Sequence, residues 1–193
     1  MGNRMGRSIG LTVVGIVLTA GATQAQVFTP TFMAPGGASD VGLYLSEGPG
    51  DFAIEGIWRR SSGGYDLGFR GGVADLGDLS VLVGGELRNP LALGAPVDVA
   101  VTGAAQGVIG DVSGAGFLVG LSVGHTFGAA DFALTPYLHP RVGLVNGFGP
   151  DDFELELLAD FGFDFRISPR LDLRFGIAVD DVGAEWGVGF AWR

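Results

Sequence analysis

The chain has 193 residues, a formal net charge of −10, no cysteine and only two histidines. This length suffices for one domain with a sizeable core. The lack of cysteine excludes a disulfide framework and thiolate metal sites, and the scarcity of histidine argues against a histidine metal cluster. The acidic balance argues against nucleic acid as a partner, because nucleic acid attracts positive charge.

Residues 1–25 have the pattern of a cleavable signal peptide. Arg4 and Arg7 make a short basic start, an apolar stretch follows, and Thr23-Gln24-Ala25 places small residues where signal peptidase reads. The apolar stretch is short for a membrane-spanning helix, although an uncleaved anchor is the alternative. We therefore expect an exported protein. Residues 26–38 carry Pro and Gly without a sustained period, and we expect them to form an N-terminal leader.

From residue 39 to residue 193, apolar and polar residues alternate in segments that turn-forming residues separate. A period of two is typical of a β-strand with one apolar face. Most segments have about 9–12 residues, close to the length that a tilted strand needs to cross a bilayer. Ten strands are expected, at residues 39–47, 51–60, 64–75, 78–88, 96–107, 115–127, 131–145, 152–167, 170–180 and 182–193. Eight is the alternative, if the segments at 39–47 and 96–107 are not counted.

The polar face of these segments is unusually small. Many of its positions are glycine, including Gly84, Gly120, Gly176, Gly187 and Gly189. A face bathed in water has no need of such small residues, whereas a face packed inside a narrow barrel does. This pattern favours an apolar face that points outward, towards lipid.

Charged residues on the polar face can pair across the predicted hairpins. Folding about Ser61-Ser62-Gly63-Gly64 and about Ser168-Pro169 can place opposite charges opposite each other, which is favourable between strands. Inside a closed barrel such pairing is close to obligatory, because an unpaired buried charge is costly. The expected pairs are Glu55 with Arg70, Arg59 with Asp66, Asp164 with Arg174, and Arg166 with Asp172. With Arg141 and Glu156, these residues form the expected lumen charge network; Glu86, Arg88, Asp160 and Glu185 are also expected in the lumen.

Aromatic residues are expected at one membrane interface. If the first strand starts in the periplasm, several aromatic residues on the apolar face come to lie at periplasmic strand ends, as in the aromatic girdle of an outer-membrane barrel. They are Trp58, Tyr65, Phe127, Phe132 and Trp192. A spanning sheet must also close, because lipid cannot satisfy an open edge. The predicted fold is therefore all-β, a closed antiparallel up-and-down transmembrane β-barrel.

The sequence resembles the small outer-membrane β-barrels of Gram-negative bacteria, the OmpA/OmpX-like class. The signal peptide, the hairpin "LDLRFGIAVDDVGAEWGVGFAWR" and its aromatic, alternating last strand carry the resemblance. It implies residence in the outer membrane, contact with its lipid, and assembly from the periplasm by the barrel-assembly machinery. In that class the last strand usually ends in an aromatic residue, whereas here Trp192 is followed by Arg193.

No catalytic, cofactor or metal site is expected. His125 is interpreted as an interfacial residue, and His139 as a lumen histidine that could form a network with Glu156. Barrel lipid A deacylases use a His-Ser-Glu arrangement, and neither histidine here has the neighbouring serine. The carboxylates of "DDFE" (151–154) and "VDDVG" (179–183) are interpreted as solvated turns, because they lack EF-hand spacing.

The function expected from these observations is that of a monomeric integral outer-membrane barrel, with a structural role in the envelope and at most minor passage of small solutes. Two alternatives remain open at this stage. The first is a lipid-modifying barrel enzyme. The second is a soluble periplasmic protein, either a lipocalin-like barrel or a β-sandwich, whose phenylalanines would line a ligand cavity or a core.

Overall fold

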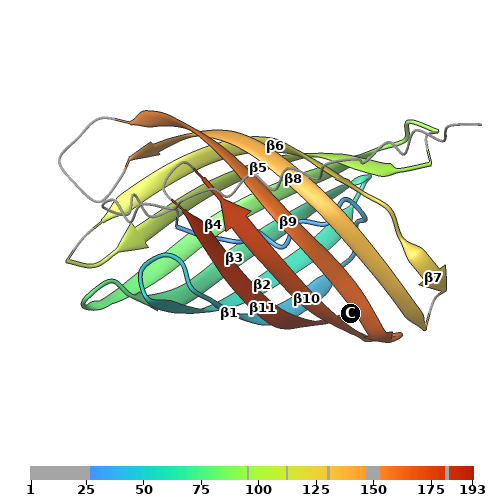
Figure 1. Ribbon diagram of the computed structural model, residues 1–193, viewed down its shortest axis with the longest axis horizontal. Coiled ribbons are helices and arrows are strands. Elements are labelled where there is room, and N and C mark those ends of the chain that lie inside the picture. Colours follow the sequence, from blue (N-terminus) through green and yellow to red (C-terminus); the bar gives the residue numbers. More distant parts are fainter. Residues whose placement is uncertain (1–26, 95, 112, 130, 147–152, 181–182) are drawn as a thin grey trace, which may run out of the picture.

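The computed structural model describes residues 27–193 except 95, 112, 130, 147–152 and 181–182. The predicted signal peptide, and parts of the acidic turns at 151–154 and 179–183, therefore lie outside the described residues. Regular structure in the described residues consists of β-strands (Figure 1). They are β1 (Asp40–Ser46), β2 (Phe52–Ser62), β3 (Tyr65–Asp75), β4 (Leu79–Leu91), β5 (Asp98–Ile109), β6 (Gly114–Gly124), β7 (Phe127–Ala129), β8 (Phe132–Asn146), β9 (Glu154–Ser168), β10 (Leu171–Val179) and β11 (Ala184–Trp192). The described residues contain no helix long and apolar enough to cross a membrane.

The strands close into a barrel. β1 to β6 pair in sequence order, and so do β8 to β11. The ring is completed by pairing of β6 with β8 and of β11 with β1. The short β7 keeps the register of β6 against β8, so it continues β6 after a break at residues 125–126. Among the described residues the wall thus has ten strands, and this confirms the ten-strand prediction over the eight-strand alternative.

The apolar face of the wall points outward. Exposed and buried positions alternate along β1, β2 and β3, as the period of two predicts. Large apolar side chains such as Phe69, Phe117 and Leu157 are exposed, whereas charged side chains such as Glu55 and Arg174 are buried. The soluble alternative is therefore wrong, because a lipocalin-like barrel or a sandwich would bury its phenylalanines.

The hairpin between β2 and β3 differs from the predicted register by two residues. Gly63 and Gly64 form the loop, both with positive φ (62° and 92°), and Ser62 lies opposite Tyr65. Tight hairpin turns of this kind need positive φ at both loop positions, which glycine adopts freely and serine does not. Consequently Arg70 lies opposite Ile57, so the predicted direct opposition of Glu55 with Arg70, and of Arg59 with Asp66, is wrong.

The hairpin between β9 and β10 has the predicted register. Asp164 lies opposite Arg174, and Arg166 lies opposite Asp172. An irregularity between Leu171 and Asp172 lets the turn close without changing this pairing. β9 thus places Phe161 and Phe163 outward, and Asp160 and Asp164 inward.

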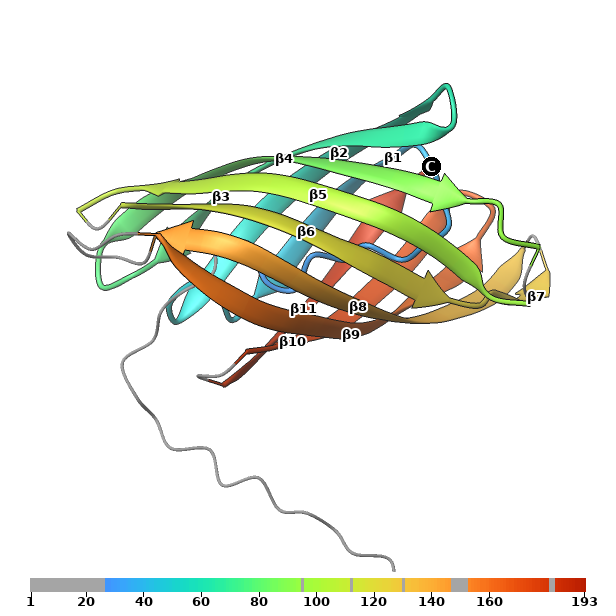
Figure 2. The same cartoon turned by 90° about the horizontal axis from the view of Figure 1, so that it is seen from above.

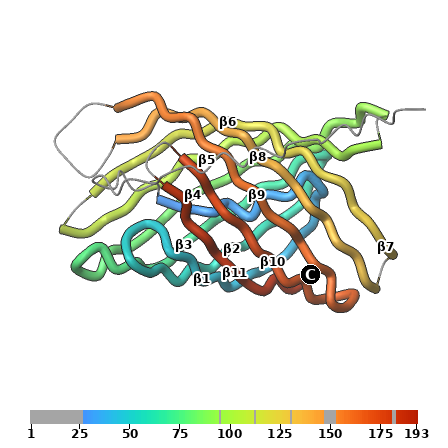
Figure 3. Tube along the Cα trace, viewed as in Figure 1, coloured from blue at the N-terminus to red at the C-terminus, as the bar shows by residue number. Residues whose placement is uncertain are grey.

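The N-terminal leader lies inside the barrel. Residues 27–35, here called the luminal segment, are buried, and Figures 2 and 3 show the blue end of the chain running within the ring of strands. Val27 and Phe28 pack against Leu82 and Val108, near the ends of β4 and β5 that are remote from the C-terminus. Ala34 reaches Arg88, near the opposite end of β4. The segment therefore spans the lumen before β1 turns back into the wall.

An arginine placed on the lipid face tests the orientation of the wall. Val119 lies at the middle of β6 and is exposed. We expect Val119→Arg to reduce the free energy of unfolding in lipid vesicles by about 2–4 kcal/mol, because a mid-bilayer arginine on the lipid face is costly. Urea unfolding followed by gel mobility with and without boiling measures it. The matched control, Val97→Arg, lies beside the start of β5 and should cost about 0–1 kcal/mol. Equal effects at both positions would contradict the assignment of a membrane midplane.

Candidate functional site

The lumen gathers most of the charged side chains that the sequence analysis selected. Those that are almost fully buried are Glu55, Arg59, Asp66, Arg70, Arg141, Asp172 and Arg174, and those that are partly buried are Glu156, Asp164 and Arg166. They project from the inward positions of β2, β3, β8, β9 and β10. Their carboxylates and guanidinium groups form the clusters described below.

Arg174 is the centre of the first cluster. Its Nη2 lies 2.6 Å from an oxygen of Asp40, and its Nε lies 3.1 Å from an oxygen of Asp164. Its Nη1 donates a 2.8 Å hydrogen bond to the hydroxyl of Tyr44. One arginine thus links β10 with β9 on one side and, over the intervening β11, with the start of β1 on the other. The sequence analysis did not select Asp40, because its strand shows only a short alternating pattern.

The second cluster joins β2, β3 and β4. Nη2 of Arg70 lies 2.6 Å from a carboxylate oxygen of Glu55, so these two residues pair diagonally although they are not directly opposed. Arg59 pairs closely with Glu86. Asp66, the partner predicted for Arg59, instead lies directly opposite Arg88, at 2.8 Å from its Nε. The shift of the hairpin register explains this exchange of partners.

His139 belongs to a third cluster, at mid-lumen. His139 lies opposite Asp160 on β9, whereas the predicted neighbour, Glu156, lies opposite Gly143. The carboxylate beside the imidazole is therefore that of Asp160. Nε2 of His139 lies 2.7 Å from the hydroxyl of Thr102, and its Nδ1 lies 2.9 Å from the hydroxyl of Thr31. Arg141 contacts the other oxygen of Asp160 at 2.5 Å. The imidazole is 1% exposed and is enclosed by the wall and the luminal segment.

The luminal segment is the feature that sequence reasoning missed. Its hydrogen bonds run to side chains of the wall: carbonyl oxygens of Pro30, Thr31, Met33 and Ala34 accept from Arg70, Arg59, Ser122 and Arg88. Phe28 and Phe32 are both 0% exposed. The excess of glycine on the inward face was the available signal, because the wall leaves more room than its own side chains fill.

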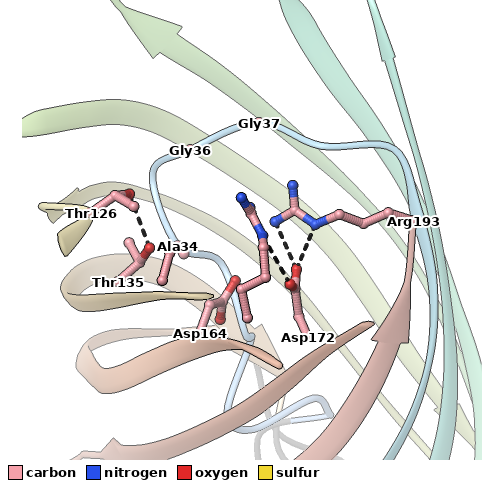
Figure 4. Close-up of a pocket in the computed structure, with 10 residues that line it drawn as sticks. Ala34, Gly36, Gly37, Thr126, Thr135, Asp164, Asp172 and Arg193 are labelled. Carbon is pink, nitrogen blue, oxygen red and sulfur yellow. Dashed lines mark hydrogen bonds and ion pairs between the residues drawn. The ribbon is translucent and has the colours of Figure 1, made fainter. Parts of the chain in front are cut away.

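The mouth of the barrel on the C-terminal side, here called the C-terminal mouth, holds a small polar cavity of about 80 Å³ (Figure 4). Asp172 accepts hydrogen bonds there from Nε of Arg193, at 2.7 Å, and from Nε of Arg166, at 3.4 Å. Arg193 therefore continues the ion-pair network at this mouth. The cavity has room for a few water molecules.

The five aromatic residues predicted for the girdle are exposed and lie towards the C-terminal mouth. Trp58 and Trp192 both lie opposite Val41, one on each side of it in the sheet. Tyr65, Phe127 and Phe132 begin β3, β7 and β8 beside turns on the same side. Contact of these side chains with lipid headgroups stays a prediction. His125 lies among them, with its ring 4.6 Å from that of Phe127 in an edge-on arrangement.

No group of three or more metal-ligating side chains occurs within the described ranges. The site is thus a charged, hydrogen-bonded lumen that encloses a peptide segment, inside a wall with an apolar outer surface. A membrane requires that a spanning sheet be closed, and its hydrocarbon favours an apolar outer surface. The fold and the lumen together define an integral membrane β-barrel of the outer-membrane type.

Comparison with known proteins places the chain beside solved outer-membrane barrels. It is similar to the KdgM porin, with 9% identity and a TM-score of 0.48 over 80% of this chain and 98% of the porin. The NanC porin shows 8% identity and a TM-score of 0.48 over 81% of this chain and 100% of the porin. The N-terminal barrel domain of Pseudomonas aeruginosa OprF shows 14% identity and a TM-score of 0.39 over 81% of this chain and 98% of that domain. No family model and no curated protein matches the chain.

Removal of the Arg174 side-chain charge tests the first cluster. We expect Arg174→Met to lower the free energy of unfolding by about 3–5 kcal/mol, because the carboxylates of Asp40 and Asp164 lose their buried partner. Urea titration of the protein in lipid vesicles, followed by tryptophan fluorescence, measures the loss. Arg60→Met is the matched control, since Arg60 is exposed on β2. A loss at Arg174 no greater than that at Arg60 would show that the cluster does not stabilise the barrel.

Proposed function

We propose that the protein is a structural barrel of the outer membrane whose lumen is closed by its own N-terminal segment. In this proposal the C-terminal mouth faces the periplasm, the barrel-assembly machinery inserts the chain, and the barrel is a monomer surrounded by outer-membrane lipid. Small solutes pass only when the luminal segment moves. The observation that carries the proposal is the burial of residues 27–35 within the ring of strands.

The contacts of the segment support closure along the length of the lumen. Phe28 packs with Leu82 and Val108 towards one mouth, and Phe32 packs with Tyr44 and Ile57 further along. Beyond Phe32, the carbonyl of Ala34 accepts a 2.5 Å hydrogen bond from Arg88. A path for ions would have to cross these positions. Resting closure is therefore the state that the packing favours.

We propose no catalytic role for the lumen. His139 is the candidate base of the lipid-modifying alternative, and both of its ring nitrogens face threonine hydroxyl groups, of Thr31 and Thr102. A reaction on lipid would need the imidazole in reach of the membrane. Its enclosure between the wall and the luminal segment argues against that role.

Ion conductance in planar lipid bilayers tests the closure. We expect the native protein to be silent, and a variant with Phe28→Ala and Phe32→Ala to conduct, because loss of both rings loosens the segment without removing a charge of the wall. The matched control is Phe69→Ala with Phe117→Ala, which removes two exposed rings from the lipid face and should stay silent. Retained heat-modifiability in gels shows that each variant is folded. Steady conductance of the native protein would contradict the proposal.

A further inference from the structure

The luminal segment is held in the way that a receptor holds a peptide. It forms no strand, and its recorded hydrogen bonds run to side chains of the wall. Peptides recognised by a sheet usually add a strand to an open edge. A closed barrel offers no such edge, so side chains must supply the donors and acceptors instead. The wall therefore carries its own set of peptide-binding groups.

Thr31 is the anchor of this recognition. Its N–H donates to Asp160 at 3.1 Å, and its hydroxyl donates to the same carboxylate and lies 2.9 Å from Nδ1 of His139. Its carbonyl oxygen accepts from Nη2 of Arg59 at 3.2 Å and from Nη1 of Arg70 at 3.3 Å. Each polar group of this residue thus has a partner on the wall, and β2, β3, β8 and β9 all contribute.

Glycines of the wall form recesses for the flanking side chains. A Cβ at Gly84 would lie 2.6 Å from the ring of Phe28, and a Cβ at Gly187 would lie 2.8 Å both from the ring of Phe32 and from Pro30. The guanidinium carbon of Arg70 lies 4.5 Å from the centre of the Phe28 ring, close enough for a cation–π contact. The ring of Phe32 lies 4.5 Å from that of Tyr44. The wall is therefore shaped for an aromatic residue on each side of a Thr-Pro-Thr turn of the chain.

The arginines of the wall that bind the segment are neutralised without it. Each arginine that binds a carbonyl of the segment also pairs with a carboxylate of the wall, namely Arg59 with Glu86, Arg70 with Glu55 and Arg88 with Asp66. Residues 27–35 carry no charge. Departure of the segment would leave each of these arginines with its counter-ion, although the partly buried Glu185 would lose its hydrogen bond from Thr29. The segment is therefore more easily exchanged than a charged core element would be.

We propose that the lumen is a peptide-binding site, and that the luminal segment is its tethered resident ligand. The ligand class is an uncharged polypeptide with the pattern Phe-Thr-Pro-Thr-Phe, and its resident form is supplied by this chain. Thr31 forms hydrogen bonds with Asp160, His139, Arg59 and Arg70. The glycine recesses accommodate the two phenylalanine rings. This inference deepens the proposed function, since it rests on the same occupied lumen.

The exposed Gly36 and Gly37 allow the tether to be cut after folding, so the barrel assembles with its ligand in place. A protease site inserted after Gly36 converts the segment into a non-covalent peptide. A fluorescent synthetic peptide with the sequence of residues 26–36 is then added, and its anisotropy reports binding. We expect saturable exchange into the cut protein and none into the uncut protein, where the tethered segment competes. A cut protein that never takes up the labelled peptide would overturn the proposal, because the segment would then be a fixed core element.

Variant peptides test the recognition. A peptide with Thr31→Val should bind roughly tenfold more weakly or worse, because it keeps the shape but loses the hydroxyl contacts with Asp160 and His139. A peptide with Met33→Leu is the matched control and should bind nearly as well as the native sequence, because leucine keeps an apolar side chain of similar volume at this buried position and the carbonyl oxygen still accepts from Ser122. Equal binding of the native, Thr31→Val and scrambled peptides would contradict the proposal that the lumen recognises this sequence pattern. Conductance of the uncut native barrel would defeat the proposed closure but leave this peptide result intact, so the two failures are distinguishable.

Discussion

The structure depends on one constraint: a closed sheet in a membrane must present hydrocarbon-like side chains outward, so its polar side chains must share a narrow interior. Charges in such an interior are tolerated only when they are paired. Arg174 shows the consequence, because it pairs at once with Asp164 on the neighbouring β9 and with Asp40 on β1, beyond the intervening β11. The ion pairs therefore tie together strands that are distant in the sequence, and they fix the shape of the space that remains.

The remaining space is filled by the chain itself. Arginines that are already neutralised by carboxylates still have N–H groups to donate, and the carbonyl oxygens of Pro30, Thr31 and Ala34 accept from them. Glycines at inward positions leave the volume that the rings of Phe28 and Phe32 occupy. The small inward-facing residues of the wall and the aromatic side chains of the luminal segment thus pack against each other. It also explains how a barrel with such a small inward face can remain well packed.

The outcome of the pairing predictions shows where sequence reasoning succeeds. The turn at Ser168-Pro169 leaves few registers, and the opposition of Asp164 with Arg174 follows from it. The turn at residues 61–64 allows two registers, and the preference of the positive-φ positions for glycine decides between them. In the register that the structure adopts, Asp66 pairs with Arg88, and Arg59 pairs with Glu86. Glu55 still pairs with Arg70, because long side chains reach diagonal neighbours as well as opposed ones.

The sequence by itself determined where most strands run and which face of each meets lipid, and it favoured ten strands over eight. These properties are local: a period of two assigns faces, and glycine, proline and aspartate mark the turns. The occupant of the lumen was decided only by the tertiary structure. Residues 27–35 have no period to reveal a location, and Thr31 finds Asp160 and His139 across more than a hundred positions of sequence. Such contacts exist only once the closed wall brings β2, β3, β8 and β9 around a common axis.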